Sequence, residues 1–257
     1  MTGPIALHGG GEFLPGDERF LSALLEAAGA PGDARAATSG RGVTDEPIRV
    51  VVVPTAAAGV DPDGAARLGT SAFERLASRL DRRLRVEVAR VVDAASAEDP
   101  ELAARIASAD LVYFPGGDPA VIPAILPESA AWRAVLAARE RGAILAGASA
   151  GAMALGPLTW TPDGIVRGLS VVRGLVVFPH ADAAMWQRQT ARFPAAAATG
   201  LGILGLGERT GVISANGASE GSGGPWLVVG EGEVRWLAPG NVEPAILVDG
   251  QSLELPA

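Results

Sequence analysis

Short apolar runs alternate with helical patterns along the first half of the chain. The runs are rich in β-branched residues and end in turn residues, as buried strands do, whereas the segments between them repeat apolar residues every three or four positions. We therefore expect strands at 4–7, 48–53, 86–92, 111–114 and 144–147, and helices at 17–28, 63–80, 97–107 and 130–141. Residues 30–47 are expected to form a surface loop.

The second half of the chain has a different pattern. Short strands separated by Gly, Asn and Ser turns are expected at 175–178, 202–206, 211–215, 226–229 and 233–237, with one helix at 183–198. The segment 230–232 has the composition of a hairpin turn. Residues 217–224 are rich in Gly and Ser and are expected to be mobile.

Near-continuous apolar strands joined by helices predict a mostly parallel sheet that is covered on both faces. We expect an α/β fold, a three-layer sandwich with short antiparallel strands near the C-terminus, forming one domain over residues 1–257. Ligands bind such a sheet beyond the carboxyl ends of its strands. Three glycine-containing turns, at 8–12, 115–118 and 147–151, fall at these ends and mark the expected site.

The composition narrows the chemistry. The 257 residues are 48% hydrophobic, enough for a sizeable core, and they include no cysteine and no lysine. These absences exclude disulfides, a thiolate nucleophile, cysteine-ligated zinc, a Walker P-loop and a Schiff-base lysine. The two histidines, His8 and His180, are too few for a histidine-rich metal site.

Charge and hydropathy bear on the partners. The net charge of −8 disfavours nucleic acid, because an acidic chain repels the phosphate backbone. No apolar run approaches the roughly 20 residues of a membrane-spanning helix. The N-terminus has no visible secretory signal, so we expect a cytoplasmic protein. We also expect a homodimer, because twofold dimers are the commonest oligomers.

Gly147-Ala148-Ser149-Ala150-Gly151 matches the pattern G-x-S-x-G between an expected strand and a helical pattern. Small flanking residues let the backbone pass through a strained strand-to-helix turn that exposes the serine hydroxyl at the top of the sheet. The amide of Ala150 then lies at a helix N-terminus, where it can stabilise an oxyanion. Ser149 is the candidate nucleophile, although a tight turn with an incidental serine has the same pattern.

A serine nucleophile needs a base, and His180 is our candidate because it follows the expected strand 175–178. His8 also follows a strand and remains the alternative. The base needs a carboxylate that fixes its tautomer. Asp163, in a Pro-Asp-Gly turn, is favoured over Glu208, which follows the strand 202–206. Asp163 also fits an Asp-Gly turn that carries no chemistry, and Glu208 also fits a helix or strand cap or an ion pair with Arg209.

Taken together and in order, these segments resemble the peptidase E and cyanophycinase family of serine peptidases, whose fold is similar to that of class I glutamine amidotransferases. The resemblance is carried by residues 9–12, 114–118, 147–152 and 177–180, and more loosely by 202–208 and 212–217. The ordered set covers nearly the whole chain and is far more specific than any one motif.

The resemblance implies a serine peptidase with Ser149 as nucleophile, His180 as general base and an acid at a position like Asp163. It also implies oxyanion donors at the amides of Gly117 and Ala150. Members act on small peptides, often releasing an N-terminal aspartate or cutting β-aspartyl–arginine bonds. They need no metal and no organic cofactor.

The candidate substrate contacts are Asp118, Arg188 and Arg192. An arginine would pair with a substrate carboxylate through two charge-assisted hydrogen bonds. Two features depart from the family pattern: Pro119 stands where many members have glutamine, and Ala181 stands where an aromatic residue usually follows the histidine. These departures argue against aspartate specificity and leave acyl transfer untouched.

Two other functional classes fit the same residues. An esterase or amidase would share the acyl-enzyme step, and a non-catalytic member of the amidotransferase-like fold would use the site for binding. A nucleotide-binding site at Gly9-Gly10-Gly11 is disfavoured because no G-x-G-x-x-G follows.

Overall fold

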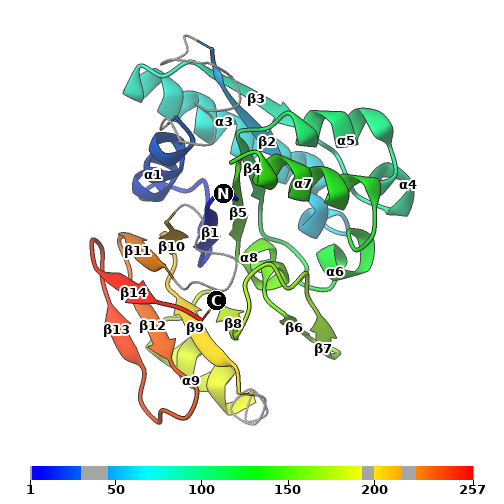
Figure 1. Ribbon diagram of the computed structural model, residues 1–257. Helices are drawn as coiled ribbons and strands as arrows, with labels where there is room; N and C mark the ends of the chain where they lie inside the picture. The colour runs from blue at the N-terminus through cyan, green and yellow to red at the C-terminus, as the bar shows by residue number, and fades with distance from the viewer. Residues whose placement is uncertain (1, 30–45, 193–199, 216–223, 257) are drawn as a thin grey trace.

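An eight-stranded sheet forms the centre of the structure, a computed structural model that describes residues 2–29, 46–192, 200–215 and 224–256 (Figure 1). The strand order is β14-β11-β10-β1-β5-β4-β2-β3. Five neighbouring strands are parallel: β1 (Ile5–His8), β5 (Ile144–Ala148), β4 (Leu111–Phe114), β2 (Ile48–Val52) and β3 (Leu84–Val88). Three antiparallel strands extend the sheet beyond β1: β10 (Thr210–Ser214), β11 (Pro225–Gly230) and β14 (Ser252–Glu254).

Helices cover both faces of this sheet. Alternate residues of each strand point to opposite sides, so Ala6, Val50 and Val52 pack with α1 (Glu18–Gly29) and α3 (Pro62–Leu80). Ile5, Leu7 and Val51 pack on the other side in a second apolar cluster. The short helices and turns on that side are η1 (Thr55–Ala57), α4 (Ala94–Ala97), α5 (Pro100–Ala107), α6 (Val121–Ile125) and α7 (Ala130–Glu140).

A smaller sheet of four strands lies at the lower left of Figure 1, and its inner face shares an apolar cluster with α8 (Ala150–Leu155). Its order is β13-β12-β9-β8, and only β8 and β9 are parallel. Its strands are β8 (Leu175–Phe178), β9 (Gly202–Leu206), β12 (Val234–Leu237) and β13 (Ala245–Leu247). Trp186 of α9 (Ala183–Arg192) packs on its outer face, and β6 (Leu158–Thr161) and β7 (Gly164–Arg167) form a separate hairpin.

The mostly parallel sandwich with antiparallel strands near the C-terminus confirms the predicted fold class. The hairpin expected at 230–232 was wrong, because β11 belongs to the large sheet and β12 to the small one. The chain changes sheets at this Gly-rich turn. The strand expected at 86–92 lies earlier, as β3. The loop expected at 30–47 falls largely, and the mobile segment expected at 217–224 almost wholly, outside the described residues.

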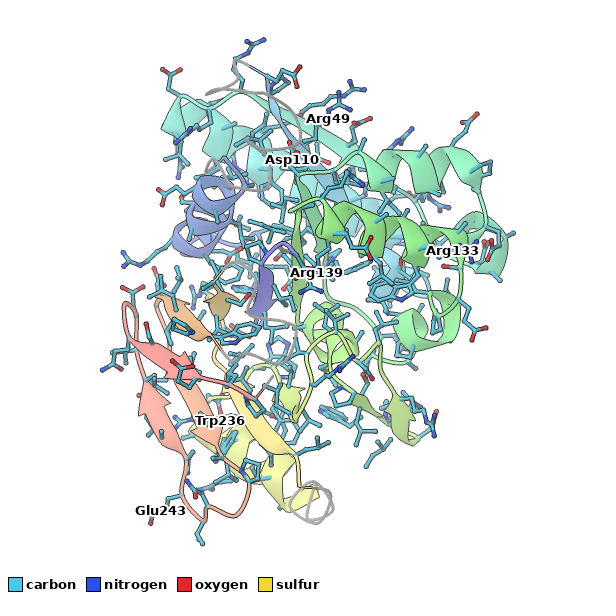
Figure 2. All side chains as sticks on the ribbon, viewed as in Figure 1. Arg49, Asp110, Arg133, Arg139, Trp236 and Glu243 are labelled. Atoms are coloured by element: carbon cyan, nitrogen blue, oxygen red, sulfur yellow. The ribbon has the colours of Figure 1, made fainter. Side chains whose placement is uncertain are left out.

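The amino end of β1 is held by two hydrogen bonds between Gly3 and Arg139. The carbonyl of Arg139, labelled in Figure 2, accepts a hydrogen bond from Gly3 N–H at 2.7 Å, and Arg139 Nε donates to the Gly3 carbonyl at 3.2 Å. In the small sheet Trp236, also labelled, covers Gly202 so closely that a Cβ there would lie 2.0 Å from the indole ring. The glycine-containing turns at 8–12, 115–118 and 147–151 follow β1, β4 and β5 at the opposite end of the large sheet, where the carboxyl ends of these strands lie.

Candidate active site

Ser149 lies in a strained turn between β5 and α8. Its backbone has φ 48° and ψ −115°, a conformation that non-glycine residues rarely adopt. Its N–H donates to the His8 carbonyl at 2.9 Å, which fixes the turn against β1. A side chain at Gly151 would place its Cβ 2.3 Å from the Phe114 carbonyl oxygen. The small residues of the G-x-S-x-G pattern therefore permit the close approach that the sequence indicated.

The imidazole of His180 lies against the Ser149 hydroxyl. The Oγ of Ser149 and Nε2 of His180 are 3.0 Å apart, within hydrogen-bond distance. His180 follows β8 of the small sheet and has a positive φ of 53°. Its N–H donates to the Gly9 carbonyl at 2.8 Å. The two sheets thus bring together residues that lie 31 positions apart in the chain.

Glu208 supplies the carboxylate beside the other ring nitrogen. Its Oε1 lies 3.2 Å from Nδ1 of His180, and it sits in the link between β9 and β10, where the chain passes from the small sheet to the large one. The sequence favoured Asp163 as the carboxylate beside His180, but the structure places Glu208 there. Asp163 lies in the exposed turn of the β6–β7 hairpin, and the described carboxylate in contact with His180 is that of Glu208.

The two expected oxyanion donors, the amides of Gly117 and Ala150, follow residues that lie at the site: Gly116, on which a Cβ would be 3.6 Å from Ser149 Oγ, and Ser149 itself. Ala150 N–H is the first of α8 and has no intrahelical acceptor, and Gly117 N–H donates no hydrogen bond to any described residue. The turn that carries Gly117 packs so tightly that a Cβ there would lie 2.2 Å from the Ala56 carbonyl oxygen. Neither amide has an acceptor among the described residues, which is what the expected role of oxyanion donor requires.

The candidate base His180 and the carboxylate of Glu208 beside it are open to solvent. The side chain of His180 is 40% exposed and that of Glu208 is 53% exposed. Water therefore screens the attraction between the imidazole and the carboxylate. Within the described ranges, no three His, Asp or Glu side chains gather closely enough to hold a metal ion.

Of the three candidate substrate contacts, the two whose side chains are described, Asp118 and Arg188, share no contact that brings them together. Asp118 is exposed, and its Oδ1 accepts from Ala120 N–H at 2.8 Å, so it caps its own turn. Arg188 is exposed on α9. Arg192 ends α9, and its side chain lies outside the described part of the chain.

Sequence reasoning missed Glu12 as a residue of the site. Its Oε1 accepts from Gly116 N–H at 2.7 Å, and a Cβ on Gly116 would lie 2.7 Å from this oxygen and 3.6 Å from Ser149 Oγ. The signal was present, because Glu12 ends the first glycine-rich turn at the carboxyl edge of the sheet. His8, the alternative base, is fully buried behind that turn and faces Asp17 instead.

Comparison with known proteins identifies the family to which the chain is similar. The family model described as Peptidase family S51 matches residues 43–200, a range that includes Ser149 and His180 and ends before Glu208. No curated protein sequence matches the chain. Among the described residues, no helix combines the length and the apolar character that crossing a membrane requires.

Two solved structures resemble the whole chain. A peptidase from an acI-B1 Actinobacterium is 25% identical, with a TM-score of 0.73, over 99% of this chain and 98% of its own. A candidate peptidase E protein from Listeria monocytogenes EGD-e is 14% identical, with a TM-score of 0.58, over 90% of this chain and 100% of its own, and supports the fold alone. Because the family model covers more than half of the chain, the protein belongs to peptidase family S51 and is a serine-type peptidase of the peptidase E kind.

Proposed function

We propose that the protein hydrolyses short peptides through a Ser149–His180–Glu208 triad and an acyl-enzyme intermediate. Ser149 Oγ attacks the scissile carbonyl carbon while His180 Nε2 takes the hydroxyl proton, and Glu208 accepts the Nδ1–H of the imidazolium. The amides of Gly117 and Ala150 stabilise the oxyanion. His180 then returns the proton to the leaving amine, and water cleaves the ester by the same route in reverse.

One observation carries this proposal: Ser149 Oγ lies 3.0 Å from His180 Nε2 at a strained strand-to-helix turn. Strain of this kind is kept only where the surroundings enforce it, and it gathers at sites where a side chain must be presented to a ligand. The carboxylate 3.2 Å from Nδ1 completes the orientation of the ring.

Glu12 supports a substrate with a free α-amino group. Its carboxylate lies next to the turn that carries Gly117 and close to the nucleophile. A bare negative charge at this place would disfavour the oxyanion. The ammonium of an N-terminal residue whose carbonyl is attacked would bring a compensating positive charge to the same place. The proposal therefore favours dipeptidase or aminopeptidase action.

The first test is replacement of the nucleophile. Ser149→Ala is expected to abolish peptide hydrolysis and covalent labelling by a fluorophosphonate, with an unchanged thermal unfolding curve. Labelling is read by intact mass, which reports one adduct per chain in the wild type. Full hydrolytic activity in Ser149→Ala would refute the triad.

The second test is a substrate panel. It contains uncharged, α-aspartyl and β-aspartyl dipeptides, each with a free and an acetylated N-terminus, together with simple esters. Cleavage of the free peptides and not of their acetylated partners is the expected result. Cleavage restricted to esters would replace the peptidase assignment of this site with an esterase one.

A further inference from the structure

The turn after β1, residues 8–12 (the β1 turn), contacts every segment that carries a member of the proposed triad. This follows from the sheet order, since β1 lies between β5 and β10 and its last residue, His8, is level with Ala148 and Gly211. The turn therefore leaves the sheet between the nucleophile and the segment that carries Glu208.

Three successive carbonyls of the β1 turn accept three amides of the site. His8 O accepts from Ser149 N–H at 2.9 Å. Gly9 O accepts from His180 N–H at 2.8 Å, and Gly10 O accepts from Arg209 N–H, next to Glu208, at 2.7 Å. The three donors, Ser149, His180 and Arg209, all have positive φ, between 48° and 54°. The β1 turn thus sets three strained backbone positions at once.

The rest of the turn reaches the ring and the oxyanion site. Gly10 lies under the His180 imidazole, and a Cβ there would be 2.2 Å from Cε1. Glu12 accepts from Gly116 N–H, one residue before the proposed oxyanion donor Gly117. A shift of the turn would therefore move the nucleophile, the base and the oxyanion site together.

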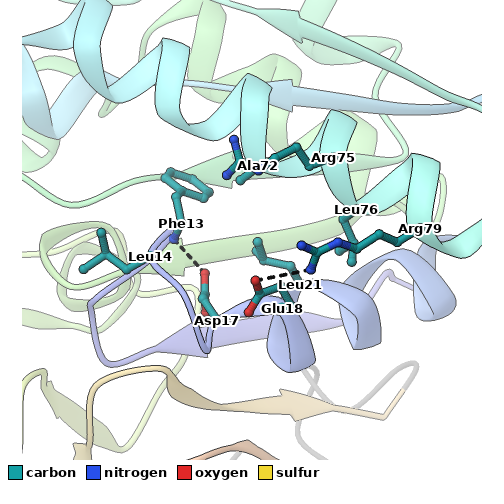
Figure 3. A pocket seen from close by; sticks show the side chains of 9 residues that line it. All are labelled: Phe13, Leu14, Asp17, Glu18, Leu21, Ala72, Arg75, Leu76 and Arg79. Atoms are coloured by element: carbon teal, nitrogen blue, oxygen red, sulfur yellow. Dashed lines mark hydrogen bonds and ion pairs between the residues drawn. The ribbon is translucent and has the colours of Figure 1, made fainter.

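A buried pair, His8 and Asp17, holds the turn from behind. Their side chains are 0% and 1% exposed, and His8 Nε2 lies 2.9 Å from Asp17 Oδ1, off the line of a good hydrogen bond. His8 Nδ1 accepts from Gly10 N–H at 3.4 Å, and its ring packs on Phe20 with a centroid distance of 4.5 Å. Asp17 Oδ2 accepts from Phe13 N–H at 2.8 Å, as Figure 3 shows.

These contacts fix the tautomer of His8. Because Nδ1 accepts from Gly10 N–H, the ring proton of His8 lies on Nε2, the nitrogen 2.9 Å from Asp17 Oδ1. Tyr113 is buried near the pair, and burial together with the negative charges of Asp17 and Glu12 raises the pKa of its hydroxyl, so it stays protonated. The two side chains thus accept from backbone amides on both sides of the turn: His8 Nδ1 accepts from Gly10 N–H, and Asp17 Oδ2 accepts from Phe13 N–H.

We propose that His8 and Asp17 are positioning residues, which hold the β1 turn in the conformation that brings Ser149, His180 and Glu208 into register. The inference rests on the proposed function. It assigns a task to the second histidine, which sequence reasoning left as an alternative base. Neither side chain touches the substrate in this scheme, because both are buried behind the turn.

Asp17→Asn tests the proposal with a side chain of the same shape. The amide nitrogen must face either the Phe13 N–H or His8 Nε2. In the first arrangement the new amide N–H and the Phe13 N–H, both donors, face each other. In the second, His8 Nε2 must accept from the amide, so the ring proton moves to Nδ1 and faces the Gly10 N–H donor. Misplacement of reacting groups by ~1 Å can lower turnover about 100-fold, so we expect kcat to fall by about 10- to 100-fold with KM changed about twofold or less.

Ser214→Ala is the matched control. Ser214 is also buried and accepts from Ile5 N–H at 2.8 Å, at the other end of the same strand β1. It is expected to lower the thermal unfolding temperature and to leave kcat and the fluorophosphonate labelling rate unchanged. Asp17→Asn is expected to slow labelling by the same factor as kcat, measured on folded protein. A folded Asp17→Asn variant with wild-type kcat and labelling would overturn the proposal.

A second pair of variants carries the test if Asp17→Asn does not fold. His8→Asn places Oδ1 where Nδ1 accepts from Gly10 N–H, whereas His8→Ala removes this acceptor. We expect His8→Asn to label faster than His8→Ala, and equal rates would overturn the proposal. A wild-type chain that the fluorophosphonate does not label would instead overturn the proposed function, and this inference with it.

Discussion

Glu208→Gln tests the acid of the proposed triad. The substitution removes the charge and keeps the shape of the side chain beside His180, whose Nδ1 lies 3.2 Å from Glu208 Oε1. The matched control is Asp163→Asn, in the exposed turn of the β6–β7 hairpin. Because both carboxylates fit the sequence pattern, the pair of variants decides between them directly.

The size of the expected effect follows from exposure. Two unit charges ~4 Å apart attract by about 1 kcal/mol in water and about 4 kcal/mol at an effective dielectric constant near 20. With His180 40% exposed and Glu208 53% exposed, the attraction in this site falls between these limits. A loss of roughly 1.4–2.7 kcal/mol corresponds to about a 10- to 100-fold fall in kcat/KM.

This fall is smaller than the roughly 10⁴-fold loss seen when the acid of a buried triad is neutralised. Part of that larger loss arises because an amide holds the histidine in the wrong tautomer. In the Glu208→Gln variant the new side-chain amide is exposed and can rotate to present its oxygen to Nδ1, so the wrong tautomer adds little here.

The assay is kcat/KM on a cleaved dipeptide, together with the fluorophosphonate labelling rate and circular dichroism to verify folding. Asp163→Asn is expected to stay within about twofold of the wild type, as surface changes away from a site usually do. The reasoning would be refuted if Glu208→Gln kept full kcat/KM, or if Asp163→Asn lost as much as Glu208→Gln.

Two further outcomes are expected. Gly10→Ala should push the imidazole away, because its Cβ would lie 2.2 Å from His180 Cε1, and kcat/KM should fall about 100-fold; unchanged steady-state kinetics would contradict the contact. Asp249→Asn should lower the free energy of unfolding by up to ~1 kcal/mol at pH 7 in urea titrations. Hydrogen bonding to Arg19 and to Gly230 N–H lowers the pKa of Asp249, so this contribution is present above the unfolded pKa of ~3.9 and disappears as the pH falls through the folded pKa. An unfolding difference that persisted at the acid end would contradict the pairing.

The parallel core and the strained turn that carries Ser149 could be predicted from local sequence signals. Runs such as Leu111–Phe114 are short, continuously apolar and followed by turn residues, as buried strands are, and G-x-S-x-G between a strand and a helix defines its own turn. Each of these signals depends on residues within a few positions of one another.

The carboxylate that lies beside His180 could not be chosen in this way. Asp163 and Glu208 both follow apolar segments, and the one nearer the serine in sequence lies in a hairpin away from the ring. The deciding fact is that β9 belongs to the small sheet while β10 belongs to the large one, so the link between them passes His180. The same change of sheet at Gly230–Gly232 makes a turn that is indistinguishable from a hairpin by composition. Strand partners are set by distant residues, which a local pattern does not contain.

Glu208 is exposed, whereas His8 and Asp17 are buried, and we therefore expect the carboxylate to act through its charge and the buried pair through the position of the backbone. Water weakens the electrostatic help that an exposed carboxylate can give, whereas backbone hydrogen bonds at 2.7–2.9 Å from one turn hold the amides of Ser149, His180 and Arg209 whatever the solvent does. Geometry should therefore matter at least as much as charge for this enzyme. High salt offers a direct comparison: it should reduce the difference between the wild type and Glu208→Gln, because screening weakens exposed charge pairs, and leave the defect of Asp17→Asn unchanged. Equal salt dependence of the two defects would argue that the buried pair acts through its charge and not through the position of the turn.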